Sequence, residues 1–256
     1  MRLRRLTEDW FFIIKETLAI SFPTVADALL GRVTIARCDE RLDHWSRRLV
    51  EGTRAELRIH GREQIDWSRA YIVMSNHQSY FDIPVLFQSV PGTMRMVTKA
   101  ELFKIPVWGR AMRDAGFIAI DRRNRLSAIA SLKQAATQIH NGTHVWIAPE
   151  GTRSLDGRLL ALKKGGFRLA LETGAPILPV FLSGTFDVLT PNDPFVHKDR
   201  SVDITFGAAI EATGKSCDQL MDEVRGFFEA QPPRPLPAGP LPAGPLTRRT
   251  ADPQDR

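Results

Sequence analysis

The sequence predicts an α/β fold in which a central, mostly parallel sheet is flanked by helices. Apolar runs of strand length recur after residue 70, and segments with helical spacing separate them. The hydrophobic fraction of 43% and the charged fraction of 25% are ordinary for a globular protein. A length of 256 residues also suffices for a large domain with a sizeable core.

The first 58 residues are expected to form an amphipathic helical segment, with helix over 8–54 and a break near Pro23. Three arginines at its start precede the aromatic and aliphatic run from Trp10 to Ile14. Neither this run nor the uncharged run from Thr17 to Ala26 approaches the roughly 20 residues that a membrane-spanning helix needs. A basic, aromatic segment of this kind can lie in the membrane interface, and the alternative is a helix packed on the protein's own core. We expect membrane contact, with peripheral or monotopic attachment on the cytoplasmic face.

The predicted catalytic domain, 59–230, contains the alternating strands and helices. Strands are expected at 71–74, 94–98, 117–121, 144–149, 177–183 and 202–206, and the alternation at 55–60 is also compatible with a strand. A helix between the third and fourth of these strands ends at Asn141 and Gly142. Its apolar residues recur at spacings of three and four: Leu126, Ile129, Leu132, Ala136 and Ile139. The last helix is expected to start at Ser216, with Gln219 placed for a capping box.

The composition changes in the tail, 231–256. The pentapeptide LPAGP occurs at 236–240 and again at 241–245. Proline and glycine at that density cannot build a core, so we expect a disordered tail. Such segments act more often as spacers than as proline-rich partner motifs, which is the alternative.

Charge and cysteine usage narrow the functional classes. The net charge of +6 fits nucleic acid, a membrane surface or anionic small molecules as partners. Because no segment forms a block of basic residues, we expect no nucleic-acid partner. Cys38 and Cys217 lie far apart without metal or redox spacing, which favours a reducing compartment and no disulfide.

His77 and Asp82 are the first candidates for catalysis, because they follow the apolar run at 71–74 directly. A carboxylate that accepts a hydrogen bond from one imidazole nitrogen leaves the other nitrogen free to take a proton from a hydroxyl. This is the His–Asp half of a catalytic triad without a protein nucleophile, so the nucleophile would be the substrate's own hydroxyl. The alternative is a surface histidine beside a helix-capping aspartate.

Two further stretches follow predicted strands. One ends in Asp121 and Arg122, and the other is the segment Pro149 to Arg153. Ligands bind at the carboxyl edge of α/β sheets, and glycine allows the backbone to approach a ligand closely. An arginine provides a planar fork for phosphate oxygens. Either loop alone could be an ordinary connection, but together they present a base, its orienting carboxylate and arginines.

This set of motifs resembles the glycerolipid acyltransferase family, most closely the 1-acylglycerol-3-phosphate acyltransferases. The matching positions are Asn76, His77 and Asp82; Gly116, Ile120, Asp121 and Arg122; Pro149 to Ser154; and Pro179. The connecting segments 99–109 and 162–170 are also similar, and the likeness covers about residues 70 to 207. Ala119 stands where the family usually has Phe, and Ala148 where an aromatic residue is frequent, which puts acceptor and acyl-chain preference in question.

The resemblance implies a reaction in phospholipid biosynthesis. His77, oriented by Asp82, would deprotonate the free hydroxyl of a 1-acylglycerol-3-phosphate, which would attack the thioester of acyl-CoA or acyl carrier protein and give phosphatidic acid. No cofactor or metal ion would be needed. The residues expected to bind the acceptor phosphate or to shape its site are Arg122, Glu150, Gly151, Thr152, Arg153, Lys99 and Lys104. For Lys99 and Lys104, the alternative is a solvated surface position.

Three other functions are weighed against this one. A metal-dependent hydrolase using His77 and Asp82 would need further ligands at metal spacing beside them, and the first motif has none. A non-catalytic lipid-binding module would be expected to carry a damaged first motif, and here that motif is intact. An acyltransferase for another lysolipid, of the lysophosphatidylcholine type or a lyso-aminolipid, stays open at this point.

Overall fold

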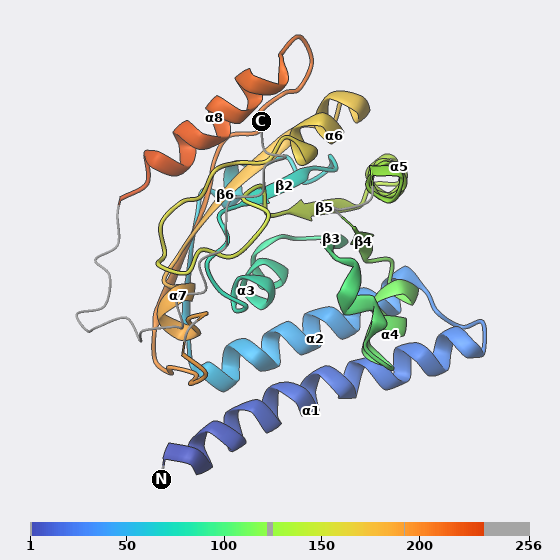
Figure 1. The fold of residues 1–256 in the computed structure, drawn as a ribbon, viewed down its shortest axis with the longest axis vertical. Helices are drawn as coiled ribbons and strands as arrows, with labels where there is room; N and C mark the ends of the chain where they lie inside the picture. Colours follow the sequence, from blue (N-terminus) through green and yellow to red (C-terminus); the bar gives the residue numbers. More distant parts are fainter. Residues whose placement is uncertain (1, 122–124, 192, 233–256) are drawn as a thin grey trace.

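A seven-stranded sheet forms the centre of the protein (Figure 1). The computed structural model describes residues 2–121, 125–191 and 193–232, and in this part the strand order is β1-β7-β6-β2-β5-β3-β4. The strands are β1 (Glu56–His60), β2 (Ile72–Ser75), β3 (Met94–Lys99), β4 (Ile118–Ile120), β5 (His144–Ile147), β6 (Ile177–Ser183) and β7 (Ser201–Phe206). Neighbouring strands run parallel except for β6 and β7, so the predicted mostly parallel sheet is confirmed.

Strand β2 is apolar from Ile72 to Met74 because both faces of the sheet are covered. Along β2, Ile72 and Met74 belong to one hydrophobic core, while Tyr71, just before the strand, and Val73 belong to the other. Successive side chains of a strand point to opposite faces, so a strand between two cores shows no polar alternation. The strand ranges predicted from apolar runs match the observed ones closely.

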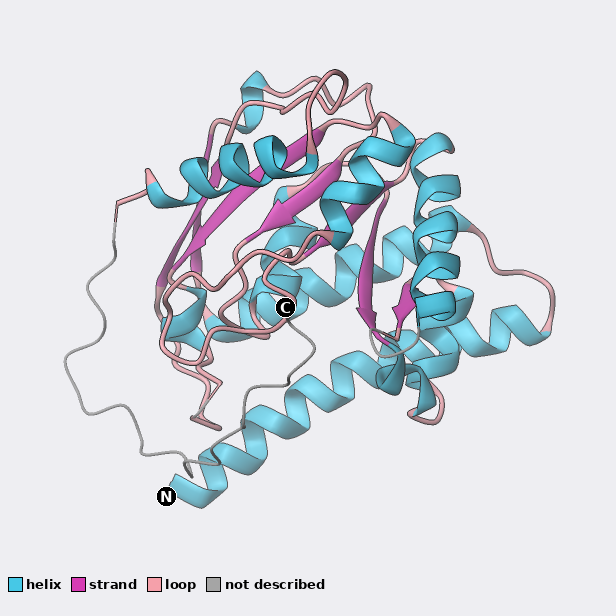
Figure 2. Ribbon diagram, turned by 45° about the horizontal axis from the view of Figure 1, so that its top comes forward, coloured by secondary structure: helices cyan, strands magenta, loops and turns pink. Residues whose placement is uncertain are grey.

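Helices form a layer on each face of the sheet (Figure 2). One face carries α5 (Arg125–His140), α6 (Gly165–Thr173) and α8 (Cys217–Glu229). The other carries α2 (Ile35–Thr53), α3 (Asp82–Ser89) and α4 (Trp108–Asp114), and α1 (Arg2–Leu29) packs against α2 and α4. The short helices α7 (Thr185–Val188), η1 (Arg62–Gln64) and η2 (Ala100–Lys104) lie in connections.

Two predicted helices are confirmed, together with their end signals. Gly142, with a φ of +82°, follows the end of α5, as the Asn-Gly signal indicated. Ser216 caps α8, where its hydroxyl accepts a hydrogen bond from the backbone N–H of Gln219, and the Gln219 side chain accepts one from the Ser216 N–H. This reciprocal pair is the predicted capping box.

The predicted helix break near Pro23 is wrong. Helix α1 continues through Pro23, and the chain breaks instead between Leu29 and Ile35. Proline removes one intrahelical hydrogen bond, a cost that packing of α1 on α2 and α4 offsets. Gly31 adopts a φ of +66°, which ends a helix readily, and the Thr34 side chain caps α2 by accepting from Arg37 N.

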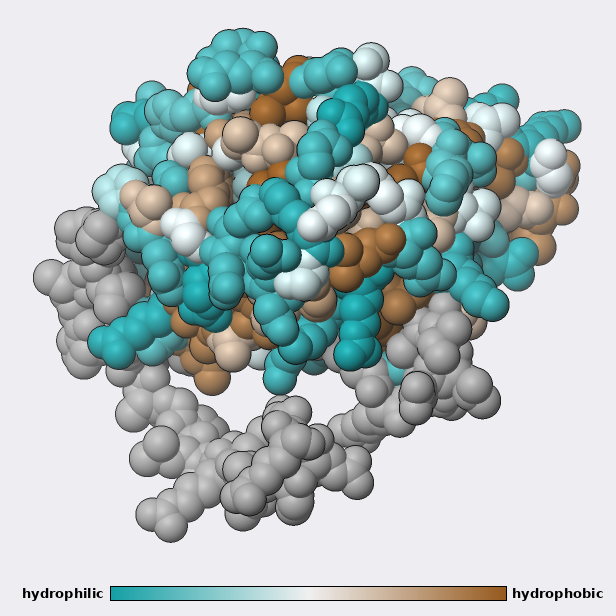
Figure 3. All heavy atoms as spheres, turned by 90° about the horizontal axis from the view of Figure 1, so that it is seen from above, coloured by the Kyte–Doolittle hydropathy of each residue, from teal (hydrophilic) through white to brown (hydrophobic). Residues whose placement is uncertain are grey.

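Helix α1 buries several polar side chains and exposes several large apolar ones. Its buried polar residues are Asp9, Glu16, Ser21 and Thr24. Its exposed large apolar residues are Phe11, Ile14, Phe22 and Leu29. Asp9 pairs with Lys198 at 3.3 Å and Glu16 with Arg48 at 3.6 Å. The face of the molecule on the other side of the sheet, over α8 and α6, is largely hydrophilic (Figure 3).

No helix in the described ranges combines the length and the apolar character that crossing a bilayer requires. The division between a segment up to residue 58 and a domain from 59 stays a prediction, and β1 lies across that boundary and pairs with β7. The predicted tail, 231–256, lies outside the described residues apart from Gln231 and Pro232.

Candidate active site

Two loops that follow neighbouring strands form the candidate active site. Strand β2 pairs with β5 on one side and with β6 on the other, so their carboxyl ends lie next to each other. The first loop, 76–81, leads from β2 into α3. The second, 148–164, leads from β5 into α6. This edge of a parallel sheet is where ligands bind in α/β folds.

Asn76 fastens the first loop to the sheet. Its side-chain amide donates to the backbone oxygen of Leu182 at 2.9 Å, and its side-chain oxygen accepts from Leu182 N at 2.7 Å. Leu182 belongs to β6, so the two bonds extend the pairing of β2 with β6 beyond the end of β2. Both polar atoms of the Asn76 side chain are therefore bound to β6, which fixes the position of the residue directly before His77.

His77 and Asp82 are in direct contact, as the motif predicted. Nδ1 of His77 lies 2.8 Å from Oδ2 of Asp82, which is completely buried at the first position of α3. The same oxygen accepts the backbone N–H groups of Gln78 and Ser79, both at 2.9 Å. An ionised carboxylate suits three donors of this kind. The contact fixes the imidazole tautomer with its proton on Nδ1.

The second imidazole nitrogen of His77 is available to a ligand. The side chain is 17% exposed and lines a cavity of about 1630 Å³. Its Nε2 has no hydrogen-bond partner among the residues that the structure describes. The Trp146 ring stands edge-on to the imidazole, with a centroid distance of 5.8 Å and an interplanar angle of 87°. The His77 ring is therefore held by Asp82 at Nδ1 and by Trp146 at its side, and Nε2 can accept a proton from a ligand.

Glu150 joins the two loops and does not line the cavity. One carboxylate oxygen accepts from His77 N and the other from Leu160 N, both at 2.7 Å. In addition, Ser154 N donates to the backbone oxygen of His77 at 2.8 Å. Burial raises the pKa of the Glu150 carboxyl above its ordinary value of 4.5, an effect that the hydrogen bonds from Leu160 and His77 oppose. Its place in the site is thus to hold the backbone of His77.

Arg153 reaches the cavity from the second loop, beside Gly151 and Thr152. Its guanidinium carbon lies 3.5 Å from the centre of the Tyr80 ring. Nη1 is buried and has no hydrogen-bond partner within the described ranges. Gly151 adopts a φ of +76°, a conformation that residues with a side chain rarely take. The loop therefore places a cationic, donor-rich group in the same cavity wall as His77.

A cavity of about 1630 Å³ extends from these loops to the N-terminal helices. The apolar residues in its wall come from α1, α2, α3 and α4 and include Ile13, Ile20, Leu42, Trp45, Phe87 and Met112. His77, Gly151, Thr152 and Arg153 lie in the same wall. The cavity thus joins the loops of His77 and Arg153 to a wall rich in apolar side chains, among which polar residues such as Ser21 and Thr24 also lie. A mixed lining of this kind suits a ligand with a polar and an apolar part.

The other predicted phosphate contacts differ in their placement. Lys99 is exposed and lines the cavity, while Lys104 is exposed outside its wall. Arg122 lies outside the described residues, so its contact with the phosphate stays a prediction. Lys163 and Arg168 also line the cavity. They were missed as site residues, although both belong to the segment 162–170 that resembles the acyltransferase family.

The wall formed by α1 and α2 was also missed. The sequence predicted a membrane-contact segment there, and the inward side of the same helices closes the cavity. The exposed aromatic residue Tyr80 within the first motif was not singled out either. Its spacing, two residues before Asp82, was the available signal.

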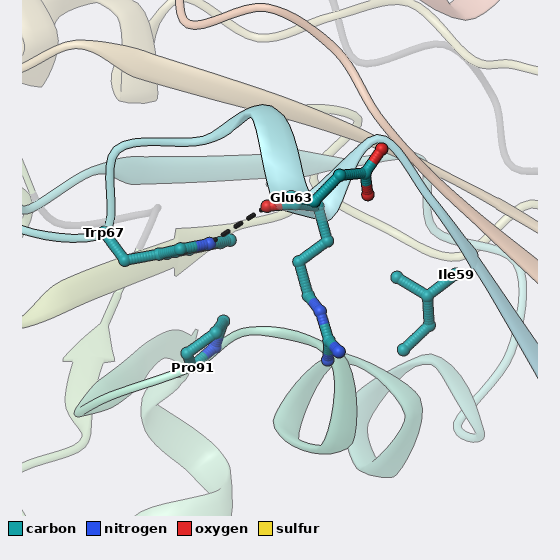
Figure 4. Close-up of a pocket in the computed structure, with 5 residues that line it drawn as sticks. Ile59, Glu63, Trp67 and Pro91 are labelled. Atoms are coloured by element: carbon teal, nitrogen blue, oxygen red, sulfur yellow. Dashed lines mark hydrogen bonds between the residues drawn. The ribbon is translucent and has the colours of Figure 1, made fainter.

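A smaller hollow of about 470 Å³ lies at the opposite edge of the sheet (Figure 4). Ile59, Arg62, Glu63, Trp67 and Pro91 line it, and Trp67 Nε1 donates to the backbone oxygen of Arg62 at 3.1 Å. None of the predicted site residues lies in its wall. In the described ranges, no three His, Cys, Asp or Glu side chains are grouped as metal ligands would be.

Comparison with known proteins gives consistent matches. A family model described as Acyltransferase matches residues 56–183. A chloroplastic 1-acyl-sn-glycerol-3-phosphate acyltransferase of Brassica napus is 35% identical over 154 residues, which are 60% of this chain and 44% of that protein. The human 1-acyl-sn-glycerol-3-phosphate acyltransferase alpha is 36% identical over 137 residues, which are 53% of this chain and 48% of that protein. This chain thus spans about half the length of the curated relatives it matches.

A solved structure resembles nearly the whole chain. The 1-acyl-sn-glycerophosphate acyltransferase of Thermotoga maritima superposes with a TM-score of 0.74 and 25% sequence identity. The match covers 91% of this chain and 99% of the other. Because it covers more of the chain than the family model, the similarity in fold extends beyond the part that the model matches.

Proposed function

Because this chain belongs to the acyltransferase family, we propose that it acylates the free hydroxyl of a 1-acylglycerol-3-phosphate to give phosphatidic acid. The acyl group comes from a thioester, either acyl-CoA or acyl carrier protein. The observation that carries the proposal is the His77–Asp82 contact at 2.8 Å, at the polar end of an apolar cavity. The names of the relatives support the choice of substrate.

His77 acts as the general base. With its Nδ1 proton held by Asp82, Nε2 takes the proton of the acceptor hydroxyl as that oxygen attacks the thioester carbon. A carbon–oxygen bond forms and the carbon–sulfur bond breaks. The leaving thiolate then takes the proton from the imidazolium. Atoms and charge balance without a cofactor.

Direct transfer to the lipid hydroxyl is favoured over an acyl-enzyme. The serine hydroxyls of the two loops already have partners: Ser79 donates to Leu189 O at 2.6 Å and Ser154 to Asp156 at 3.0 Å. Ser75 accepts from Trp146 Nε1 at 3.0 Å. None of these contacts is made to His77, so none of these hydroxyls is activated as a nucleophile.

Arg153 is the proposed partner of the acceptor phosphate. A phosphate monoester carries close to two negative charges near neutrality, and a guanidinium can bind two of its oxygens at once. The buried Nη1 without a partner in the described part of the chain is a donor that such an oxygen would satisfy. Lys99 and Lys163, on the same wall, add positive charge.

The apolar interior between α1, α2, α3 and α4 is the proposed place for an acyl chain. Apolar groups are unfavourable in water, so burial of an acyl chain here stabilises the complex by about 0.8 kcal/mol per methylene. The chain lying there would place the ester or thioester carbon near His77, at the polar end. This arrangement keeps a reactive thioester away from bulk water.

The outward face of α1 supports attachment to one leaflet of a membrane. An apolar side exposed over Phe11, Ile14, Phe22 and Leu29 is unfavourable in water and fits an acyl-chain environment. We place this contact on the cytoplasmic face, where the thioester donors are made. The lipid acceptor would then enter from the membrane without crossing water.

The experiment that tests the function is an acyl-transfer assay on the purified full chain. A panel of lysophosphatidate, lysophosphatidylcholine and a lyso-aminolipid, each with acyl-CoA and with acyl carrier protein thioester, separates acceptors and donors. We expect the highest kcat/KM with lysophosphatidate. A higher value with either other lysolipid would overturn the acceptor assignment and leave the acyltransferase chemistry.

A further inference from the structure

Tyr80 holds an unusual position in the first loop. It lies three residues after His77 and two before Asp82, yet its side chain is 54% exposed. The neighbouring residues Ser79 and Phe81 are buried. An exposed aromatic ring between buried positions is not explained by packing of the core.

The ring of Tyr80 lies against the guanidinium of Arg153. The distance from the guanidinium carbon to the ring centre is 3.5 Å, which is close contact and well inside the range of cation–π interactions. No ion pair or hydrogen bond to the Arg153 side chain occurs among the described residues. The Tyr80 ring is therefore the contact that fixes this guanidinium in the absence of substrate.

A cation–π contact uses the face of the guanidinium and leaves its edge free. The N–H groups lie in the guanidinium plane, so a ring on one face does not occupy them. Phosphate oxygens bind at that edge in a bidentate manner. Tyr80 thus orders a flexible side chain without competing for the ligand that the side chain would bind.

The backbones of the two loops are already fixed to each other. Ser154 N donates to His77 O at 2.8 Å, and Glu150 accepts from His77 N at 2.7 Å. These bonds set the positions of the Cα atoms but not that of the long Arg153 side chain. The Tyr80 contact adds the missing constraint, because it ties the cation to the loop that carries the base.

We infer that Tyr80 is a positioning residue of the acceptor site, which presents the edge of Arg153 to a phosphate monoester beside His77. This inference rests on the proposed function and names the element that sets its acceptor specificity. The phosphodiester of a choline lysolipid gains less from this arrangement, because it offers fewer anionic oxygens to the N–H groups of the guanidinium. Because Tyr80 contacts Arg153, its effect should appear in the KM for the acceptor.

The test compares Tyr80→Leu with Tyr80→Phe and Tyr80→Trp in the full-length protein. Leucine removes the ring, whereas phenylalanine and tryptophan keep an aromatic face. We expect Tyr80→Leu to raise the KM for lysophosphatidate roughly 3- to 30-fold, with kcat within about twofold and donor KM unchanged. Tyr80→Phe and Tyr80→Trp should restore the KM to within about twofold of the wild type.

A double-mutant cycle with Arg153→Gln shows whether the effect passes through the cation. In the Arg153→Gln background, Tyr80→Leu should change kcat/KM by less than about twofold. Equal losses in both backgrounds would overturn the inference, as would an unchanged KM in Tyr80→Leu alone. Vesicle sedimentation of Tyr80→Leu provides the remaining check. If this variant binds vesicles more weakly and loses equal activity in both backgrounds, Tyr80 is a membrane contact instead.

Failure of this inference is distinguishable from failure of the proposed function. A wild-type protein that does not acylate lysophosphatidate overturns both. A wild type that is active on lysophosphatidate, with Tyr80→Leu matching it in acceptor KM, overturns the role of Tyr80 alone. Because Tyr80 is largely exposed, the variants are expected to keep the wild-type melting temperature, which is measured alongside.

Discussion

Oδ2 of Asp82 binds Nδ1 of His77 at 2.8 Å and also accepts two backbone N–H groups of the intervening loop. One buried oxygen therefore determines both the shape of the loop and the orientation of the imidazole. An aspartate five residues after a histidine is needed for this closure, since the chain must turn back at the start of α3.

Replacing the base or its partner should abolish most turnover. His77→Ala is expected to reduce kcat by roughly 10²–10⁴, the usual contribution of a positioned general base, with the fold intact. Asp82→Asn should lose most activity, because an amide N–H can face Nδ1 and favour the wrong tautomer. Steady-state kinetics and a melting curve check both variants. Near wild-type kcat in His77→Ala would contradict the mechanism.

Arg153→Lys should weaken use of the phosphate monoester. A charge-assisted hydrogen bond contributes about 1.5–3 kcal/mol, so we expect a roughly tenfold to hundredfold loss in kcat/KM for lysophosphatidate. The ratio of kcat/KM for lysophosphatidate over lysophosphatidylcholine should exceed one in the wild type and collapse in the variant. Arg158→Lys is the matched control, because Arg158 lies in the same loop with its side chain 80% exposed and outside the cavity wall. A ratio unaffected by Arg153→Lys would assign this arginine elsewhere.

Polar replacements on the outer face of α1 should release the protein from membranes. Phe11→Ser and Phe22→Ser each remove an exposed aromatic ring, and we expect roughly tenfold weaker binding per ring to anionic vesicles. Ala19→Ser, an exposed position on the same helix, controls for the added hydroxyl. Sedimentation with vesicles measures the partition. Full binding by the Phe11→Ser/Phe22→Ser double variant would show that another surface attaches the protein.

Stability should fall on the acid side because of His144. This buried imidazole accepts a hydrogen bond from Tyr71 N at 3.1 Å, and burial lowers the pKa of His144 below its ordinary value of 6.5. The unfolded chain therefore binds a proton that the folded protein does not, so the free energy of unfolding declines as the pH falls below 6.5. The decline stops below the pKa of the folded state.

Urea unfolding at about pH 7.5 and about pH 5.5 measures this dependence. His144→Asn keeps an acceptor for Tyr71 N and removes the titrating group, so the variant should lose up to about 1.4 kcal/mol less per pH unit than the wild type. His44→Asn, at an exposed position, should behave like the wild type. An identical pH dependence in His144→Asn and wild type would refute the assignment.

Local sequence signals predicted the elements whose environment is uniform along their length. Ile72 to Met74 is apolar at every position because β2 has a core on each face, and Ser216 with Gln219 specifies a cap through backbone bonds alone. The His77–Asp82 contact was predictable for the same reason, since five residues and one helix start determine it.

The rest depends on contacts between distant segments. Pro23 is a helix breaker by local rules, yet packing of α1 on α2 and α4 keeps the helix continuous. The cavity wall requires the N-terminal helices to lie over α3 and α4, which no periodicity encodes. Likewise, the contact of Tyr80 with Arg153 joins positions that lie on different strand–helix connections and meet only in the folded sheet.

The exposed apolar residues of α1 have a consequence for handling the protein in the laboratory. Without a bilayer, this exposed apolar patch associates with the same patch on other molecules of the protein. The patch consists of Phe11, Ile14, Phe22 and Leu29. The association state measured in solution then reports the detergent or lipid present, and not a preference built into the chain. Extraction conditions that supply a substitute for acyl chains should decide whether the protein is recovered as dispersed particles or as aggregates.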